Sequence, residues 1–211
     1  MPTGTASVYS MKGIMLATNS KLSHRPSASI ITPPFLLKIN AIFSCFRYTL
    51  TILPKGANTM TYAAFSYARM ANEQTLQTIP AEKHDIIPAG FKNSVHWNYG
   101  HILVIADHVL GHAPTFEKTI PKEYYHPFAK GSSPLQWTDK VPSIETLQEA
   151  AAKQQQAAQK LATETGGTEK TAPFTLRGQS FQTVDELLSI VAFHEGMHYR
   201  TLLHYSNLFS N

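Results

Sequence analysis

The segment FHEGMHYRTLLHY, residues 193–205, constrains this chain more than any other part of its 211 residues. It contains the pattern H-E-x-x-H, in which two histidines four residues apart lie on one side of a helix. That helix is predicted to begin at Thr183, because Thr183 and Glu186 form a capping box. A helix of this kind must bury its apolar side, so the fold depends on which other elements can cover that side.

Both histidines of the pattern lie on the apolar stripe of this helix. Measured from Val191 at the centre of the stripe, His198 lies about 20° away and His194 about 60° away, whereas His204 lies about 140° away and is expected to face solvent. Two imidazoles one turn apart can chelate a single ion. A histidine on an apolar face can instead be a core residue, because a buried imidazole needs only a polar partner. The pair predicts a metal site, and a pair of core histidines is the alternative.

Three more helices are predicted upstream. The first spans residues 61–78 and is stopped by Pro80, and the second spans 94–111 with Pro114 just beyond it. The third begins after the N-cap Ser143. Together with the histidine-bearing helix, and without a strong strand pattern, they predict an all-α fold, a four-helix bundle. Such bundles build metal and cofactor sites from inward-facing side chains of neighbouring helices.

Two connections interrupt this pattern. Residues 114–142 are rich in proline and have few periodic apolar residues, which predicts a long loop between the second and third helices. Loops of this length are usually functional, so this one is a candidate lid. The segment FTLRGQSFQT alternates around Arg177-Gly178, which predicts a short hairpin before the last helix.

The second helix offers further histidines. His101, His108 and His112 lie within about 20° of one line along it, on a side that also carries apolar residues. They are spread over about 16 Å of helix axis, so only one of them can reach an ion held by the last helix. The geometry leaves open which one does. His96 lies off this line and is expected to be exposed or near the start of the helix.

Three histidines with an open fourth position form a catalytic kind of site rather than a structural one. Zinc, nickel or another divalent ion that prefers imidazole would fit. Such an ion lowers the pKa of a bound water or thiol and so creates a strong nucleophile near neutral pH. The one cysteine of the chain, Cys45, precedes the predicted helices, so a thiol nucleophile would have to come from a small-molecule cosubstrate.

Residues 1–59 are predicted to be a leader outside the fold, which leaves residues 60–211 as one domain. The leader contains no acidic residue, so the basic excess of the chain belongs to it. It is a targeting segment, a poor membrane anchor or, in the interpretation we favour, sequence upstream of a true start at Met60. Its apolar run at 35–53 is interrupted by a lysine and an arginine, which does not suit a membrane span. The rest of the chain has no clustered basic face, so neither a membrane nor nucleic acid is a predicted partner.

Zinc peptidases are another class that uses H-E-x-x-H. Their longer pattern H-E-x-x-H-x-x-G-x-x-H matches His194, Glu195, His198 and His204, but Thr201 stands where a glycine must let the chain leave the helix. A peptidase is therefore not the predicted function. Glu195 is a candidate catalytic residue that handles protons beside the site, and the alternative is a half-exposed helix carboxylate.

WNYGHI (97–102) on the second helix and FHEGMHYRTLL (193–203) on the last resemble the DinB superfamily of metal-binding four-helix bundles. The resemblance spans residues 61–209, with the elements in the expected order. It selects one histidine of the second helix and implies that the metal ligands are His101, His194 and His198. The segment Tyr199-Arg200-Thr201 departs from the Gly-Gln pair that often follows the second histidine in such families.

The resemblance also implies a function. Some relatives are S-transferases or isomerases that use bacillithiol, mycothiol or glutathione, so we expect a cytoplasmic, bacterial-type thiol S-transferase with a detoxification role. The thiolate would attack a small-molecule electrophile held under the 114–142 loop. A non-catalytic metal-binding sensor or sequestering protein and a metal-dependent hydrolase are the alternatives. Leu103 and Leu110, opposite the histidine line, suggest a homodimer, although packing inside one bundle would explain them as well.

Overall fold

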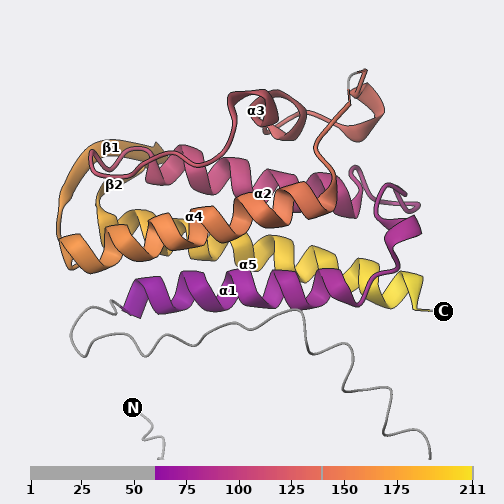
Figure 1. The fold of residues 1–211 in the computed structure, drawn as a ribbon, viewed down its shortest axis with the longest axis horizontal. Coiled ribbons are helices and arrows are strands. Elements are labelled where there is room, and N and C mark those ends of the chain that lie inside the picture. Colours follow the sequence, from indigo (N-terminus) through magenta and orange to yellow (C-terminus); the bar gives the residue numbers. More distant parts are fainter. Residues whose placement is uncertain (1–59, 139, 211) are drawn as a thin grey trace, which may run out of the picture. The chain divides into compact units, whose positions relative to one another are not determined.

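The computed structural model describes residues 60–138 and 140–210. Within them the chain forms five α-helices and one hairpin of two strands (Figure 1). The helices are α1 (Met60–Gln77), α2 (Val95–Leu110), α3 (Lys122–Phe128), α4 (Ile144–Thr165) and α5 (Val184–Phe209), and the strands are β1 (Lys170–Leu176) and β2 (Gln179–Thr183). The all-α prediction is confirmed. The predicted leader, residues 1–59, lies outside the described residues and stays a prediction.

The four long helices lie alongside one another, and α2 is the most enclosed of them (Figure 1). α1 packs along α5, while α2 contacts α3, α4 and α5. A helix that is apolar on several sides needs several neighbours, and α2 has them. Leu103 and Leu110 are fully buried by their own chain, so the second apolar face of α2 needs no second subunit to cover it. The homodimer stays a prediction without this support.

Side-chain caps fix where α2, α4 and α5 begin. The hydroxyl groups of Ser94 and Ser143 accept hydrogen bonds from backbone N–H groups in the first turns of α2 and α4. The predicted capping box of Thr183 and Glu186 is confirmed at the start of α5. These side chains satisfy N–H groups that the first turn of a helix leaves without partners. The starts of these three helices are therefore determined locally by the sequence.

The short hairpin before α5 is confirmed as well. β1 and β2 pair in antiparallel fashion, and Arg177 and Gly178 form the turn with φ values of 50° and 83°. Positive φ at both central residues matches the twist of the strands in a tight hairpin. The backbone N–H of Ala172 in β1 donates to the carbonyl of His112, 2.9 Å away, which joins the hairpin to the end of α2.

The predicted loop over residues 114–142 is wrong in part, because it contains helix α3. Proline counted against a helix in the sequence, but Pro121 lies at the N-terminal boundary of α3, where proline is tolerated. The segment is anchored by the buried carboxylate of Asp107 in α2. It accepts hydrogen bonds from the backbone N–H groups of Thr119 and Ile120, at 2.9 and 3.3 Å. No local sequence pattern reveals such an anchor.

The line of histidines that begins on α2 is buried at His101 but not at its C-terminal end. His108 is exposed and His112 only partly buried, so the expectation of an apolar face is wrong for His108. Their ring centroids lie 5.7 Å apart, and both rings lie against Phe174 of β1. His96 does lie near the start of α2, but it is buried, and both its ring nitrogens are hydrogen-bonded within the chain.

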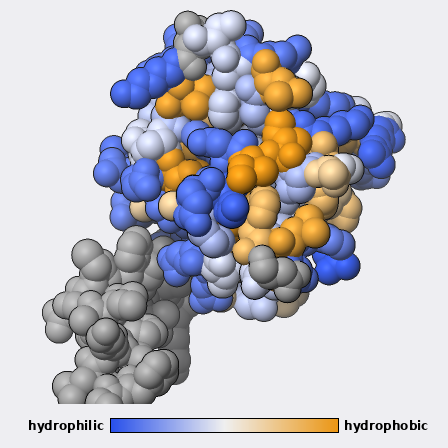
Figure 2. Space-filling model, turned by 90° about the vertical axis from the view of Figure 1, so that its right-hand side faces the viewer, coloured by the Kyte–Doolittle hydropathy of each residue, from blue (hydrophilic) through white to orange (hydrophobic). Residues whose placement is uncertain are grey.

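The surface carries scattered apolar side chains. No helix in the described part of the chain is long and apolar enough to cross a membrane. Figure 2 shows one face on which hydrophobic residues form a band among hydrophilic ones. On α5, Phe193 and Met197 are exposed, and each directly precedes a histidine of the H-E-x-x-H pattern.

Candidate metal centre

Three histidines from two helices converge between α2 and α5. His101 comes from α2, His194 and His198 come from α5, and one potential ligand atom of each lies within 4.8 Å of those of the other two. The ring centroids are 5.2, 5.1 and 4.7 Å apart. Zinc–imidazole bonds are about 2.0–2.1 Å long, so small side-chain rotations would let three such rings share one ion. No other cluster of at least three potential His, Cys, Asp or Glu ligands occurs in the part of the chain that the structure describes.

Hydrogen bonds orient two of the three rings. Nδ1 of His101 lies 2.7 Å from the carbonyl oxygen of Phe128, and Nδ1 of His198 lies 2.9 Å from Oδ1 of Asn98. Because both partners are acceptors, each Nδ1 carries the hydrogen and each Nε2 is left as the electron-pair donor. The amide of Asn98 is itself fixed, since its Nδ2 donates to the carbonyl of Ser94 at 2.7 Å. Partners of this kind hold metal-binding histidines in other proteins.

His194 differs from the other two histidines. Its Nδ1 is buried and has no hydrogen-bond partner among the described residues. An unpaired buried polar atom typically costs about 1–3 kcal/mol. If the ring bound an ion through this nitrogen, Nδ1 would gain the polar partner that it lacks among the described residues. Three imidazoles, two of them oriented by hydrogen bonds, fit a divalent ion of the zinc or nickel type.

The electrostatics keep these rings neutral. Burial lowers the pKa of His194 to about 4, and nearby His101 adds to the effect. Burial also lowers the pKa of His198 to about 3, with further contributions from His194 and His101. The pKa of His101 is lowered by burial, which the Phe128 carbonyl opposes. Metal ions bind the neutral imidazole, so the site is ready for an ion at neutral pH.

The motif around His101 has a packing reason. The ring of Trp97 stacks on that of His101, with centroids 4.4 Å apart and planes 14° apart, and its Nε1 donates to Oγ of Ser132 at 2.9 Å. Gly100 lies directly under Phe128, where a Cβ atom would come within 2.4 Å of the phenyl ring. The absence of a side chain at Gly100 therefore lets the end of α3 approach α2 and bring the Phe128 carbonyl to His101.

The comparison with known families agrees with this arrangement. The family described as the DinB superfamily matches residues 64–202, which include all three histidines. The chain belongs to the DinB superfamily. A search of curated proteins found no match. The resemblance inferred from the two histidine motifs is thereby confirmed, while the ligand roles of the histidines in this DinB superfamily member stay predictions.

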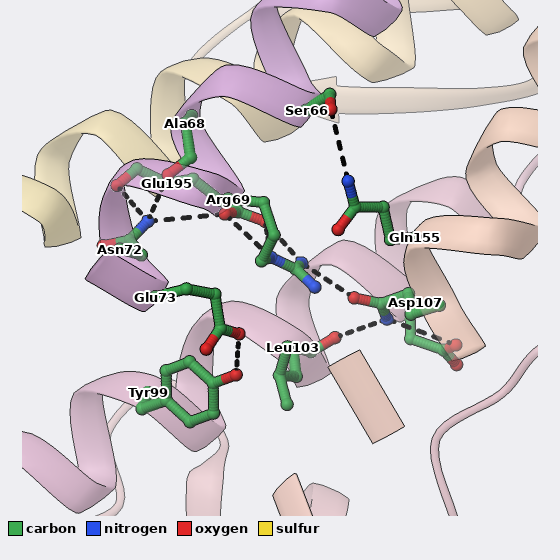
Figure 3. Close-up of polar contacts among 11 residues, drawn as sticks. Ser66, Ala68, Arg69, Asn72, Glu73, Tyr99, Leu103, Asp107, Gln155 and Glu195 are labelled. Carbon is green, nitrogen blue, oxygen red and sulfur yellow. Dashed lines mark hydrogen bonds and ion pairs between the residues drawn. The ribbon is translucent and has the colours of Figure 1, made fainter. Parts of the chain in front are cut away.

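In this DinB superfamily chain, Glu195 faces α1 rather than solvent (Figure 3). Its carboxylate is fully buried and accepts hydrogen bonds from Nε of Arg69 at 2.9 and 3.0 Å. The interpretation as a half-exposed carboxylate is therefore wrong. Burial raises the pKa of Glu195, and Arg69 and Asn72 act in the opposite direction. Its side-chain contacts are with these two residues, so proton handling at the histidines stays a prediction.

Sequence reasoning missed the groups that orient the rings. Asn98 stands inside the WNYGHI motif, and at about 100° per residue it lies about 60° from His101 on α2, which could have marked it as a neighbour of the site. The carbonyl of Phe128 gives no signal, because any residue could supply it. Arg69 gives none either, since 126 positions separate it from Glu195.

The structure has a cavity beside the predicted loop segment. A cavity of about 910 Å³ lies between α3, residues 129–142 and the start of α4, but none of the three histidines lines it. His194 and His198 are instead partly exposed, beside the exposed side chain of Met197. In this superfamily member, binding of a small molecule under the connecting segment therefore stays a prediction.

Proposed function

We propose that this chain is a metal-dependent enzyme that transfers a low-molecular-weight thiol to an electrophile. The observation that carries the proposal is the convergence of His101, His194 and His198, with the first and last ring fixed through Nδ1. The cluster contains no fourth histidine, cysteine or carboxylate from the described residues. Three protein ligands with room for a small molecule are typical of catalytic metal sites, whereas structural sites are closed by four.

The nucleophile would come from a cosubstrate. The described part of the chain has no cysteine, because Cys45 lies outside it. A divalent ion in this site would lower the pKa of a thiol bound to it, so that the sulfur reacts near neutral pH. The sulfur would form a bond to a carbon of the electrophile, the thiol proton would pass to solvent, and the leaving group would depart with the electrons of its bond.

The residues of the chain have separate tasks in this proposal. The three histidines hold the ion, and their low pKa values keep them available as ligands. Asn98 and the Phe128 carbonyl keep two rings in one orientation. Exposed Met197 offers an apolar contact for a substrate that enters along α5. A cytoplasmic location fits this chemistry, because small thiols are kept reduced there.

The test combines metal analysis with an assay for conjugation. Protein expressed from Met60 is analysed for bound metal, and the loaded protein is mixed with glutathione, bacillithiol or mycothiol and monochlorobimane. We expect thiol conjugation that disappears in His198→Ala. His204→Ala is the matched control, because it removes an exposed histidine from the same helix.

Other outcomes decide against the proposal. Bound metal without conjugation by any of the thiols would support a metal sensor or a sequestering protein. Product formation that needs the histidines but no thiol would support a metal-dependent hydrolase. Equal conjugation by the wild type and His198→Ala would exclude the three-histidine centre as the catalytic site.

A further inference from the structure

We propose that Arg69 of α1 is a positioning residue for the metal centre, and that it acts through Glu195. The inference rests on the proposed metal function of the three histidines. Glu195 lies between His194 and His198 in sequence but points to a different neighbour. The histidines meet His101 of α2. The carboxylate instead pairs with Arg69 of α1 (Figure 3). An interaction that fixes Glu195 therefore fixes the rotation of the helix that carries both histidines.

The contacts of Arg69 reach across the helices. Its Nε donates to both carboxylate oxygens of Glu195, and its Nη2 donates to the carboxylate and to Oε1 of Gln154, 2.9 Å away. Nε2 of Gln154 in turn donates to the carbonyl of Leu103 in α2 at 2.9 Å. One guanidinium thus connects α1, α4 and α5 directly and α2 through a single amide. Arg69, Gln154 and Glu195 are all fully buried.

A second contact fixes α5 beside the ion pair. Nδ2 of Asn72 donates to the backbone carbonyl of Glu195 at 3.1 Å. The side chain and the main chain of one residue are therefore both held by α1. Forked contacts between arginine and a carboxylate impose direction as well as attraction. Such contacts restrict rotation of α5 more than apolar packing alone would.

The metal centre is sensitive to this rotation. A side-chain atom about 5–6 Å from the helix axis moves by about 2 Å when the helix turns by about 20°. Metal–ligand distances must be held to within about 0.2 Å. His194 and His198 would move together, but His101 lies on another helix and would not follow them. A modest rotation of α5 would therefore separate the pair from the third ligand.

Stability alone does not account for the pair. Removing two charges from water is costly, and a buried ion pair can often be replaced by apolar residues of similar volume without loss of stability. The double variant Arg69→Met with Glu195→Leu uses this fact. It should fold, because it leaves no unpaired charge, but it lacks the directional contact between α1 and α5.

The experiment measures Co²⁺ binding by titration and by the visible absorption spectrum of the bound ion. We expect the double variant to bind Co²⁺ about 10- to 100-fold more weakly than the wild type, as for other groups that orient metal ligands. Its spectrum should also change, which a general loss of stability would not cause. Thr183→Ala is the control, because it weakens α5 by removing its cap far from the pair. It should keep the wild-type spectrum.

The outcomes separate the two proposals. If the wild type and His198→Ala bind Co²⁺ equally, the metal centre is wrong and this inference falls with it. If the wild type binds Co²⁺ and His198→Ala does not, and the folded double variant keeps wild-type affinity and spectrum, the positioning role alone is overturned. Should the double variant fail to fold, Arg69→Lys tests the positioning role instead, because lysine keeps the positive charge but cannot make the two parallel hydrogen bonds of a guanidinium. An unchanged affinity and spectrum in Arg69→Lys would overturn the positioning role.

Discussion

Two pairs of histidines, each spaced four residues apart in the sequence, have different surroundings in this fold. His194 and His198 of α5 meet His101 of α2, and hydrogen bonds orient two of these rings. The rings of His108 in α2 and of His112, just beyond the end of α2, lie against each other and against Phe174. The two pairs have the same spacing, so spacing alone would make them equally good candidates for chelating a metal ion.

The difference lies in what surrounds each pair. The α5 pair has a third imidazole on a neighbouring helix, and burial lowers its two pKa values to about 4 and about 3. For His108 burial also lowers the pKa, but the ring is exposed, and the structure brings no third ligand to it among the described residues. A histidine pair becomes a candidate metal centre when a second helix supplies another ligand and the protein holds the rings in place.

The largest difference between the pairs should be in metal affinity. His198→Ala should weaken binding of Zn²⁺ or Ni²⁺ by more than about 100-fold, because loss of a ligand should exceed the 10- to 100-fold cost of losing an orienting partner. His112→Ala should leave the affinity of the strong site unchanged. Isothermal titration of the metal-free proteins measures both. Similar losses in the two variants would mean that the pairs are not distinguished as the geometry indicates.

A smaller effect is expected from the group that orients His198. Asn98→Leu keeps a side chain of similar size but removes the acceptor for Nδ1 of His198, so the affinity should fall by about 10- to 100-fold. Asn98→Asp keeps an acceptor at this position and should bind far better than Asn98→Leu. The same titration tests both variants. Equal affinities for leucine and aspartate would show that this hydrogen bond does not orient the ligand.

Acid should destabilise the metal-free protein through the α5 pair. The folded rings have pKa values of about 4 and about 3, against an ordinary value of 6.5, so the unfolded chain binds more protons between these limits. Both rings are neutral in either state above pH 6.5, where the free energy of unfolding is highest. It falls as the pH drops from 6.5 toward 4 and then 3, because the unfolded chain takes up protons first. The expected loss by pH 4.5 is on the order of 2 kcal/mol, reduced because solvent reaches both rings.

Urea unfolding between pH 7 and 4.5 measures this loss. His198→Ala should show a shallower dependence on pH, because one of the two rings no longer titrates. His112→Ala is the matched control and should follow the wild type over this range. A dependence that is equally steep in His198→Ala would assign it to other groups.

Local patterns in the sequence were enough for part of this fold. The capping box at Thr183, the caps at Ser94 and Ser143, and the turn at Arg177-Gly178 depend on residues within a few positions of one another. For this reason the four long helices and the hairpin were predictable. Helix α3 was not, because its prolines counted against a helix and the Asp107 carboxylate anchors the residues just before it from beyond the range of local patterns, 12 positions away.

The same limit applies to the candidate site. Spacing identified the pair His194 and His198, and the family resemblance was needed to select His101 among three histidines on one line. The orientation of the His101 ring depends on a backbone carbonyl at Phe128, which no sequence pattern specifies. The burial of Glu195 depends on Arg69, which lies 126 positions away. Groups that meet only through tertiary packing leave no mark on the local sequence.

The smallest expected effect concerns Phe174, whose ring lies against His108 and His112. Phe174→Leu reduces the aromatic surface over His108 and His112, so the pKa of His108 should rise toward its ordinary value, because burial is the main cause of its lowering. The cost in stability should be about 1 kcal/mol. Phe181→Leu is the control, because its ring meets Phe174 rather than the histidines. An NMR titration of His108 in the two variants measures the shift.

If the pKa of His108 moves equally in both, the hairpin as a whole, and not the ring of Phe174, shields the second pair. The affinity of the α5 centre for metal should be unchanged in both variants, because neither phenylalanine touches a ring of that centre.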